Sequence, residues 1–75
     1  MKDFIAVLEE SSRNWSAYVP DLPGCVAAGT TRQETERLIH EAVQWHLQGM
    51  AEDGDAIPEP VYDGPGLLLR IPIAA

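Results

Sequence analysis

Residues 20–25 read Pro-Asp-Leu-Pro-Gly-Cys, and this stretch decides how the first half of the chain is arranged. Two prolines fix φ and the glycine adopts turn conformations easily, so the segment forms a rigid, non-helical corner. Pro23 also biases Leu22 toward extended geometry. We therefore predict that the Leu22 side chain is held out from the corner as a contact residue for a partner. The alternative is a tight reversal between strands in which Leu22 caps the core.

Short apolar segments on both sides of this corner predict β-strands. The first strand, over about residues 3–9, is apolar on both alternating faces, as in a central strand covered on both sides. In the second, over about residues 15–19, apolar Trp15, Ala17 and Val19 alternate with Ser16 and Tyr18, as in a strand with one face on a core and the other partly exposed. A third short strand is expected over about residues 25–29.

An amphipathic helix is predicted over about residues 31–53. Thr31 and Glu34 have the spacing of a capping box, in which each side chain binds a free amide at the helix start. An apolar stripe along the helix predicts that it covers a sheet. The stripe consists of Leu38, Ile39, Ala42, Val43, His46, Gly49 and Met50.

Three prolines make residues 54–66 an extended connector after Gly54 ends the helix. A last strand follows over about residues 67–73, with Pro72 indicating an edge or an end. Counting directions through three hairpin-linked strands and a returning helix puts this strand parallel to the first. The expected fold is a single α+β domain with β-β-β-α-β order, a mainly antiparallel sheet and one helix on one face.

Length and composition limit the size of the core. Seventy-five residues with 45% hydrophobic content make one domain near the lower size limit for a stable core. One helix covers only one face of the sheet, so we expect a homodimer or homotetramer. No apolar stretch approaches the roughly 20 residues of a membrane span, and no basic leader precedes one, so a soluble, cytoplasmic protein is expected.

The charge balance favours a basic protein partner. Twelve acidic and five basic residues give a net charge of −7, which repels phosphate backbones and opposes direct nucleic-acid binding. A field of this sign speeds encounter with a basic protein. The alternative is that the charge serves solubility alone.

Few residues suggest a catalytic site or a metal or cofactor site. Cys25 is expected to be a small buried hydrophobe, His46 a packed ring and His40 a solvated one. No CxxC pair, HExxH motif or phosphate-binding glycine loop is present, so we expect no metal and no cofactor. Of the two tryptophans, Trp15 is expected to be more exposed than Trp45. Arg70 is expected to reach solvent or a carboxylate across a subunit boundary.

The order of these elements resembles the HicB-like antitoxin family. The resemblance is carried by Phe4–Leu8, Trp15–Val19, the corner at 20–25, Gly29-Thr30-Thr31 and the segment Glu52–Pro60. It implies a partially degraded RNase H-like fold that neutralises a small RNA-cleaving toxin of the HicA type. Many members continue into a DNA-binding segment, whereas this chain stops at Ala75, so the resemblance leaves open whether it represses its own transcription through DNA.

A metal-dependent nuclease of the RNase H type needs a carboxylate in the middle of its first strand, where this chain has Ile5, Ala6 and Val7. We therefore expect a binding module and not an enzyme. The alternatives are an orphan homo-oligomer with another partner and, last, a residual nuclease. The residues expected to bind the partner are Glu9, Glu10, Trp15, Asp21 and Leu22.

Overall fold

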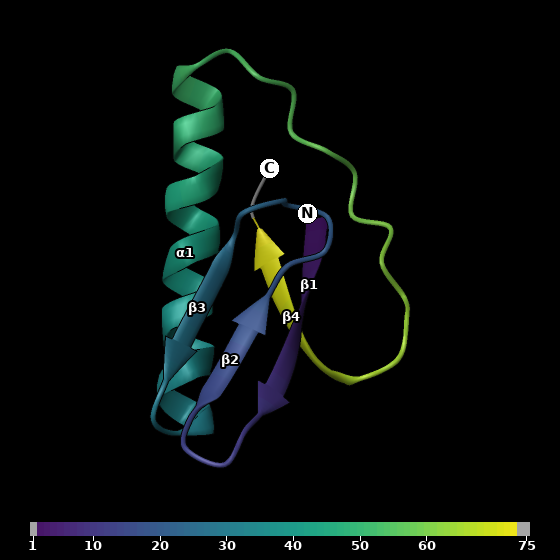
Figure 1. Cartoon of the computed structure of the whole chain (residues 1–75). Helices are drawn as coiled ribbons and strands as arrows, with labels where there is room; N and C mark the ends of the chain where they lie inside the picture. The colour runs from purple at the N-terminus through teal and green to yellow at the C-terminus, as the bar shows by residue number, and fades with distance from the viewer. Residues whose placement is uncertain (1, 74–75) are drawn as a thin grey trace.

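The computed structural model describes residues 2–73, with the backbone alone described at Lys2. The elements are β1 (Lys2–Glu10), β2 (Trp15–Tyr18), β3 (Val26–Gly29), α1 (Arg32–Glu52) and β4 (Leu67–Ile73). The strands form one sheet in the order β3-β2-β1-β4, and α1 packs mainly on β3 and β2 (Figure 1). The expected α+β fold with one helix on one face of the sheet is confirmed.

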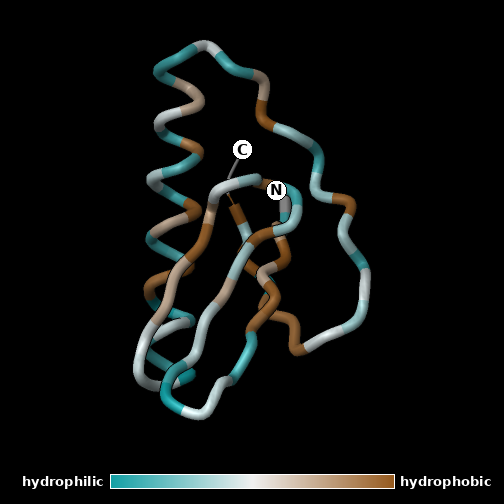
Figure 2. The backbone as a smooth tube through the Cα atoms, in the orientation of Figure 1, coloured by the Kyte–Doolittle hydropathy of each residue, from teal (hydrophilic) through white to brown (hydrophobic). Residues whose placement is uncertain are grey.

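The core lies between α1 and the sheet. Phe4, Ala6 and Leu8 alternate along β1 on the helix side and are buried, because successive strand residues point to opposite faces. Figure 2 shows hydrophobic residues on the side of α1 that faces the sheet and hydrophilic residues on its outer side. The core cluster also contains Ala17, Val19, Leu22, Cys25, Ile39, Val43, Leu47 and Ile71.

The buried side of α1 differs from the predicted stripe. Its fully covered residues are Thr35, Ile39, Val43 and Leu47, whereas His46 lies at the flank and is half-buried. Thr35 is tolerated in the core because its hydroxyl donates a 2.8 Å hydrogen bond to the Thr31 carbonyl. Within residues 2–73 no helix is long and apolar enough to cross a bilayer.

The start of α1 is capped almost as predicted. Thr31 is the N-cap, and its hydroxyl accepts a 3.1 Å hydrogen bond from the Glu34 N–H. The return bond is shifted by one residue, because the Glu34 carboxylate accepts from the backbone N–H of Thr30 at 2.7 Å. Each bond satisfies a donor at or beside the helix start that no helical carbonyl can reach.

The expected parallel last strand is wrong, because β4 pairs with β1 in antiparallel register from Lys2↔Ile73 to Leu8↔Leu67. The segment between α1 and β4, residues 53–66, returns along the side of the molecule opposite the helix (Figure 1). This return reverses the chain once more before β4 begins. All neighbouring strands are therefore antiparallel, and the handedness rule for parallel crossovers does not apply.

Candidate partner-binding surface

The five residues predicted to bind a partner lie at two ends of the sheet. Glu9 and Glu10 end β1, and Glu10 is opposite Trp15 at the start of β2, so these three share the hairpin end. Asp21 and Leu22 follow the other end of β2, in the corner that leads to β3. The structure therefore does not bring the five together in one site.

Leu22 is a core residue, and the expectation that its side chain points outward is wrong. Its side chain is 1% exposed. The corner closes by two 3.0 Å hydrogen bonds, from the Leu22 N–H to the Val19 carbonyl and from the Cys25 N–H to the Leu22 carbonyl. The tight reversal with Leu22 capping the core is the arrangement found. Cys25 is buried as predicted, and this burial raises the pKa of its thiol.

Asp21 holds the connector against the corner. One carboxylate oxygen, Oδ2, accepts hydrogen bonds from the backbone N–H groups of Val61 and Tyr62, each at 3.0 Å. The connector is ordered further by the Tyr62 hydroxyl, which donates to the Pro65 carbonyl at 2.9 Å. Both lone pairs of Asp21 Oδ2 therefore accept hydrogen bonds from within the chain, and this oxygen is not free to bind a partner. No local sequence pattern signals this contact, because the partners are about forty residues apart.

The two tryptophans exchange the roles predicted for them. Trp15 packs against the core, and the Arg32 guanidinium lies 6.0 Å from its ring centroid. Trp15 has the strand parity of buried Ala17, so its ring faces the helix. Trp45 is 73% exposed on the outer side of α1, where it lines a shallow hollow with His40, Glu41, Gln44 and Gln48.

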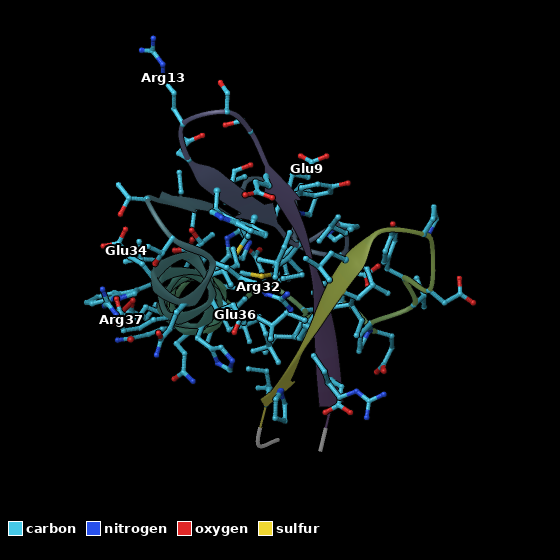
Figure 3. The ribbon with its side chains drawn as sticks, turned by 90° about the horizontal axis from the view of Figure 1, so that it is seen from below. Glu9, Arg13, Arg32, Glu34, Glu36 and Arg37 are labelled. Atoms are coloured by element: carbon cyan, nitrogen blue, oxygen red, sulfur yellow. The ribbon has the colours of Figure 1, made fainter. Side chains whose placement is uncertain are left out.

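Glu9 and Glu10 lie where β1 ends at the hairpin, and Figure 3 labels Glu9 there. Three arginines in the described residues form ion pairs within the chain, namely Arg32–Glu36 at 2.8 Å, Arg37–Glu41 at 3.3 Å and Arg70–Asp3 at 3.6 Å. Arg70 thus has a carboxylate partner within its own chain, not across a subunit boundary. Arg13 points away from the hairpin tip in Figure 3. Glu9 and Glu10 are exposed and have no cation partner among the described residues.

An apolar row crosses the sheet face that the helix does not cover. We call Val26, Tyr18, Val7 and Leu68 the open-face row, because the register places them side by side across all four strands. Val7 at its centre is buried, whereas Val26, Tyr18 and Leu68 are 64%, 38% and 39% exposed. Glu9 lies on the same face, two residues along β1 from Val7. An apolar second face was predicted, but Tyr18, Val26 and Leu68 were not named, although strand alternation indicates them.

No three His, Cys, Asp or Glu side chains in the described part of the chain lie together as a metal site. What the surface offers is an apolar strip beside unpaired carboxylates. Such a surface suits contact with another macromolecule that carries positive charge.

Solved structures share this fold. The N-terminal domain of the Burkholderia pseudomallei antitoxin HicB superposes with a TM-score of 0.82 at 15% identity, covering 97% of this chain and 99% of that one. A HicA3 and HicB3 toxin-antitoxin complex contains a chain that superposes with a TM-score of 0.68 at 24% identity, covering 81% of this chain and 71% of that chain.

Two curated proteins are related in sequence. A UPF0150 protein of Helicobacter pylori (strain J99) is 38% identical over 48 residues, which cover 64% of this chain and 67% of that protein. An uncharacterized 14.9 kDa protein of Haemophilus phage HP1 is 36% identical over 52 residues, which cover 69% of this chain. The match spans 39% of the length of the phage protein.

Residues 4–62 match the family described as HicB-like antitoxin of bacterial toxin-antitoxin systems. The match includes most of β1, all of β2, β3 and α1, and most of the connector, which carry most of the core and the Asp21 contact. The chain therefore belongs to the HicB-like antitoxin family.

Proposed function

We propose that this chain neutralises a small, basic, RNA-cleaving toxin of the HicA type by covering its working surface, without doing chemistry itself. Family membership supports an antitoxin role, and a chain of similar fold occurs in a HicA3 and HicB3 complex. The observation that carries the proposal is the open-face row with unpaired Glu9 beside it and Glu10 next along the strand.

Physical chemistry supports this pairing. A protein that cleaves RNA must attract phosphate and so carries positive charge, whereas this chain has a net charge of −7. Complementary charges raise the association rate, and exposed apolar side chains then slow dissociation. Such an encounter with an RNA-cleaving protein takes place in the cytoplasm and involves no nucleic-acid contact by the antitoxin.

The proposal of a non-enzymatic role is supported by the middle of β1. Ala6 and Val7 are buried there, with Ile5 half-buried between Phe4 and Ala6. A two-metal hydrolase needs carboxylates at fixed positions around its ions, and apolar side chains cannot supply them.

Co-expression with a small basic protein of the HicA type, sought in the reading frame next to the gene for this chain, tests the function. We expect the pair to co-purify and the antitoxin to restore growth of cells that produce the toxin. The proposal fails if the folded wild-type chain neither binds that protein nor restores growth.

Variants at the surface locate the contact. Val26→Asp and Tyr18→Ala should speed dissociation by about tenfold or more, because each removes apolar contact in the open-face row. Glu9→Lys with Glu10→Lys should slow association and weaken its salt dependence. Trp45→Ala lies on the outer side of α1 and is the control that should leave both rates unchanged.

A further inference from the structure

The connector between α1 and β4 exposes a second set of apolar and acidic side chains. Its positions alternate, because residues 58, 60, 62 and 64 are half-buried whereas residues 57, 59, 61 and 63 are exposed. Ile57 and Val61 are 40% and 75% exposed, and Asp63 forms no ion pair among the described residues. We call Ile57, Val61 and Asp63 the connector ridge. One side of the extended connector therefore packs on the protein, and the ridge faces outward.

The shape of the connector ridge is fixed within the free chain. Pro58 and Pro60 fix their own φ and bias the residues before them toward extended backbone. Asp21 Oδ2 accepts hydrogen bonds from the Val61 and Tyr62 N–H groups, which fixes the middle of the connector on the corner between β2 and β3. A partner that binds the ridge therefore orders little additional backbone, and this preorganisation favours affinity.

The connector ridge borders the open-face row. At the end of the connector, a β-carbon on Gly66 would lie 3.2 Å from Cγ1 of Val7, the central residue of that row. Further back, the connector is bound by Asp21, which comes three residues after Tyr18 of the row. The connector also runs on the side of the molecule opposite α1 (Figure 1). A partner placed on the open face of the sheet therefore meets both surfaces.

The open-face row alone is small for a stable protein complex. A standard interface takes about 800 Å² and about 20 residues from each partner. The row together with Glu9 and Glu10 provides six residues, of which Val7 is buried. A partner that binds this face tightly therefore needs further contacts beside the row, and the connector ridge offers apolar side chains at that place.

The charge of the connector selects the kind of partner. Residues 54–66 contain three carboxylates, of Asp55, Glu59 and Asp63, and no Lys, Arg or His. This segment repels a nucleic acid, and it repels a second copy of this chain, which has a net charge of −7. It attracts a protein surface that carries positive charge. The occupant that fits the ridge is therefore the basic toxin of the proposed function.

We propose that the toxin binds the connector ridge together with the open-face row. Apolar side chains of the toxin then contact Ile57 and Val61, and a Lys or Arg side chain of the toxin pairs with Asp63. Asp21 is a positioning residue, because it acts through its hold on the connector. This inference rests on the proposed antitoxin function, but it has its own test, because the ridge and the row are changed by different substitutions.

Rates of association and dissociation with a purified toxin of the HicA type test the connector ridge. Ile57→Ser combined with Val61→Ser should speed dissociation about tenfold, because apolar contact is lost. Trp45→Ser removes an apolar side chain of similar exposure from the outer side of α1, and should leave the dissociation rate unchanged. Asp63→Lys should slow association more than Glu52→Lys, which changes the net charge equally but at the end of α1.

Two substitutions of Asp21 separate its positioning role from its charge. Asp21→Asn keeps an oxygen that accepts hydrogen bonds from both N–H groups, and should bind the toxin with an affinity close to that of the wild type. Asp21→Ala, assayed where it stays folded, should bind about threefold or more weakly, because the released connector must be ordered on binding. Equal affinities of all three chains would overturn the positioning role.

Photo-cross-linking decides the contact even if the double serine variant fails to fold. The amino acid p-benzoylphenylalanine in place of Val61 should cross-link to the toxin, whereas in place of Trp45 it should not. If the wild type binds the toxin but the folded ridge variants keep the rates of Trp45→Ser, this inference is overturned and the proposed function stands. A wild type that binds no toxin overturns both.

Discussion

Asp21 and Tyr62 are joined by a 3.0 Å hydrogen bond in which the Tyr62 backbone N–H donates to Oδ2 of the Asp21 carboxylate. The Val61 N–H donates to the same oxygen at the same distance. These two bonds attach the connector to the corner between β2 and β3. The path of the connector sets the direction in which β4 enters the sheet, so one carboxylate supports the antiparallel arrangement.

Asp21→Ala should release the connector and lower the free energy of unfolding by about 1–2 kcal/mol, because two hydrogen bonds to a charged group are lost at a partly exposed site. Hydrogen exchange should show faster exchange of the Val61 and Tyr62 amides, with exchange in α1 unchanged. Asp63→Ala removes a carboxylate from the same connector and should change neither quantity. Unchanged exchange at both amides in Asp21→Ala would contradict the role of this contact.

Leu22→Ala should destabilise the chain by about 2–4 kcal/mol, because a side chain buried in the core leaves a cavity when it is truncated. Denaturant unfolding measures this loss. At temperatures where the variant stays folded, its dissociation rate from a toxin should equal that of the wild type. A faster dissociation with unchanged stability would mean that Leu22 contacts the partner directly.

The two tryptophans should differ in stability and in accessibility. Trp45→Phe should change the free energy of unfolding by less than about 0.5 kcal/mol, whereas Trp15→Ala should cost about 1–3 kcal/mol, because only Trp15 packs on the core. Fluorescence quenching by iodide should be strong in the variant that retains Trp45 alone. It should be weak in the variant that retains Trp15 alone, and the reverse order would refute the assignment.

The Glu34 carboxyl should make the free energy of unfolding depend on pH. Hydrogen bonds from the Thr30 backbone N–H and hydroxyl hold the pKa of the Glu34 carboxyl below its ordinary value. Because this pKa is lower in the folded state than in the unfolded state, the ionised carboxylate stabilises the fold at pH values above the unfolded-state pKa. This stabilisation is lost as the pH falls through the folded-state pKa. The melting temperatures of the wild type and of Glu34→Gln should therefore converge at acidic pH. Glu10→Gln, at an exposed carboxylate, serves as the control and should not show this convergence.

Local sequence patterns were sufficient to predict the helix, the strands and much of the core. The capping spacing located the start of α1 at Thr31, and the alternation in β1 located a strand whose helix side is buried. The corner at 20–25 was predicted as rigid and non-helical because proline and glycine act through their own backbone, and the tight reversal that the structure contains was the alternative to an outward Leu22. These features depend on residues close in sequence, and so the sequence specifies them directly.

Long-range features were missed for a physical reason. The direction of β4 depends on the connector, and the connector depends on a hydrogen bond between residues about forty positions apart. Extended segments with prolines have no periodicity that shows where they turn. The exposure of Trp45 and the burial of Leu22 were likewise decided by tertiary packing.

The pairing of β1 with β4 joins the two ends of the described chain, from Lys2 to Ile73. Closing this ladder requires nearly the whole chain to form one loop, which costs more entropy than any hairpin in the sheet. β4 receives little support from α1 and is held mainly by β1. The last strand is therefore the cooperative unit that opens first in the native state, and native-state hydrogen exchange should show β4 amides exchanging at a lower opening free energy than those of β2.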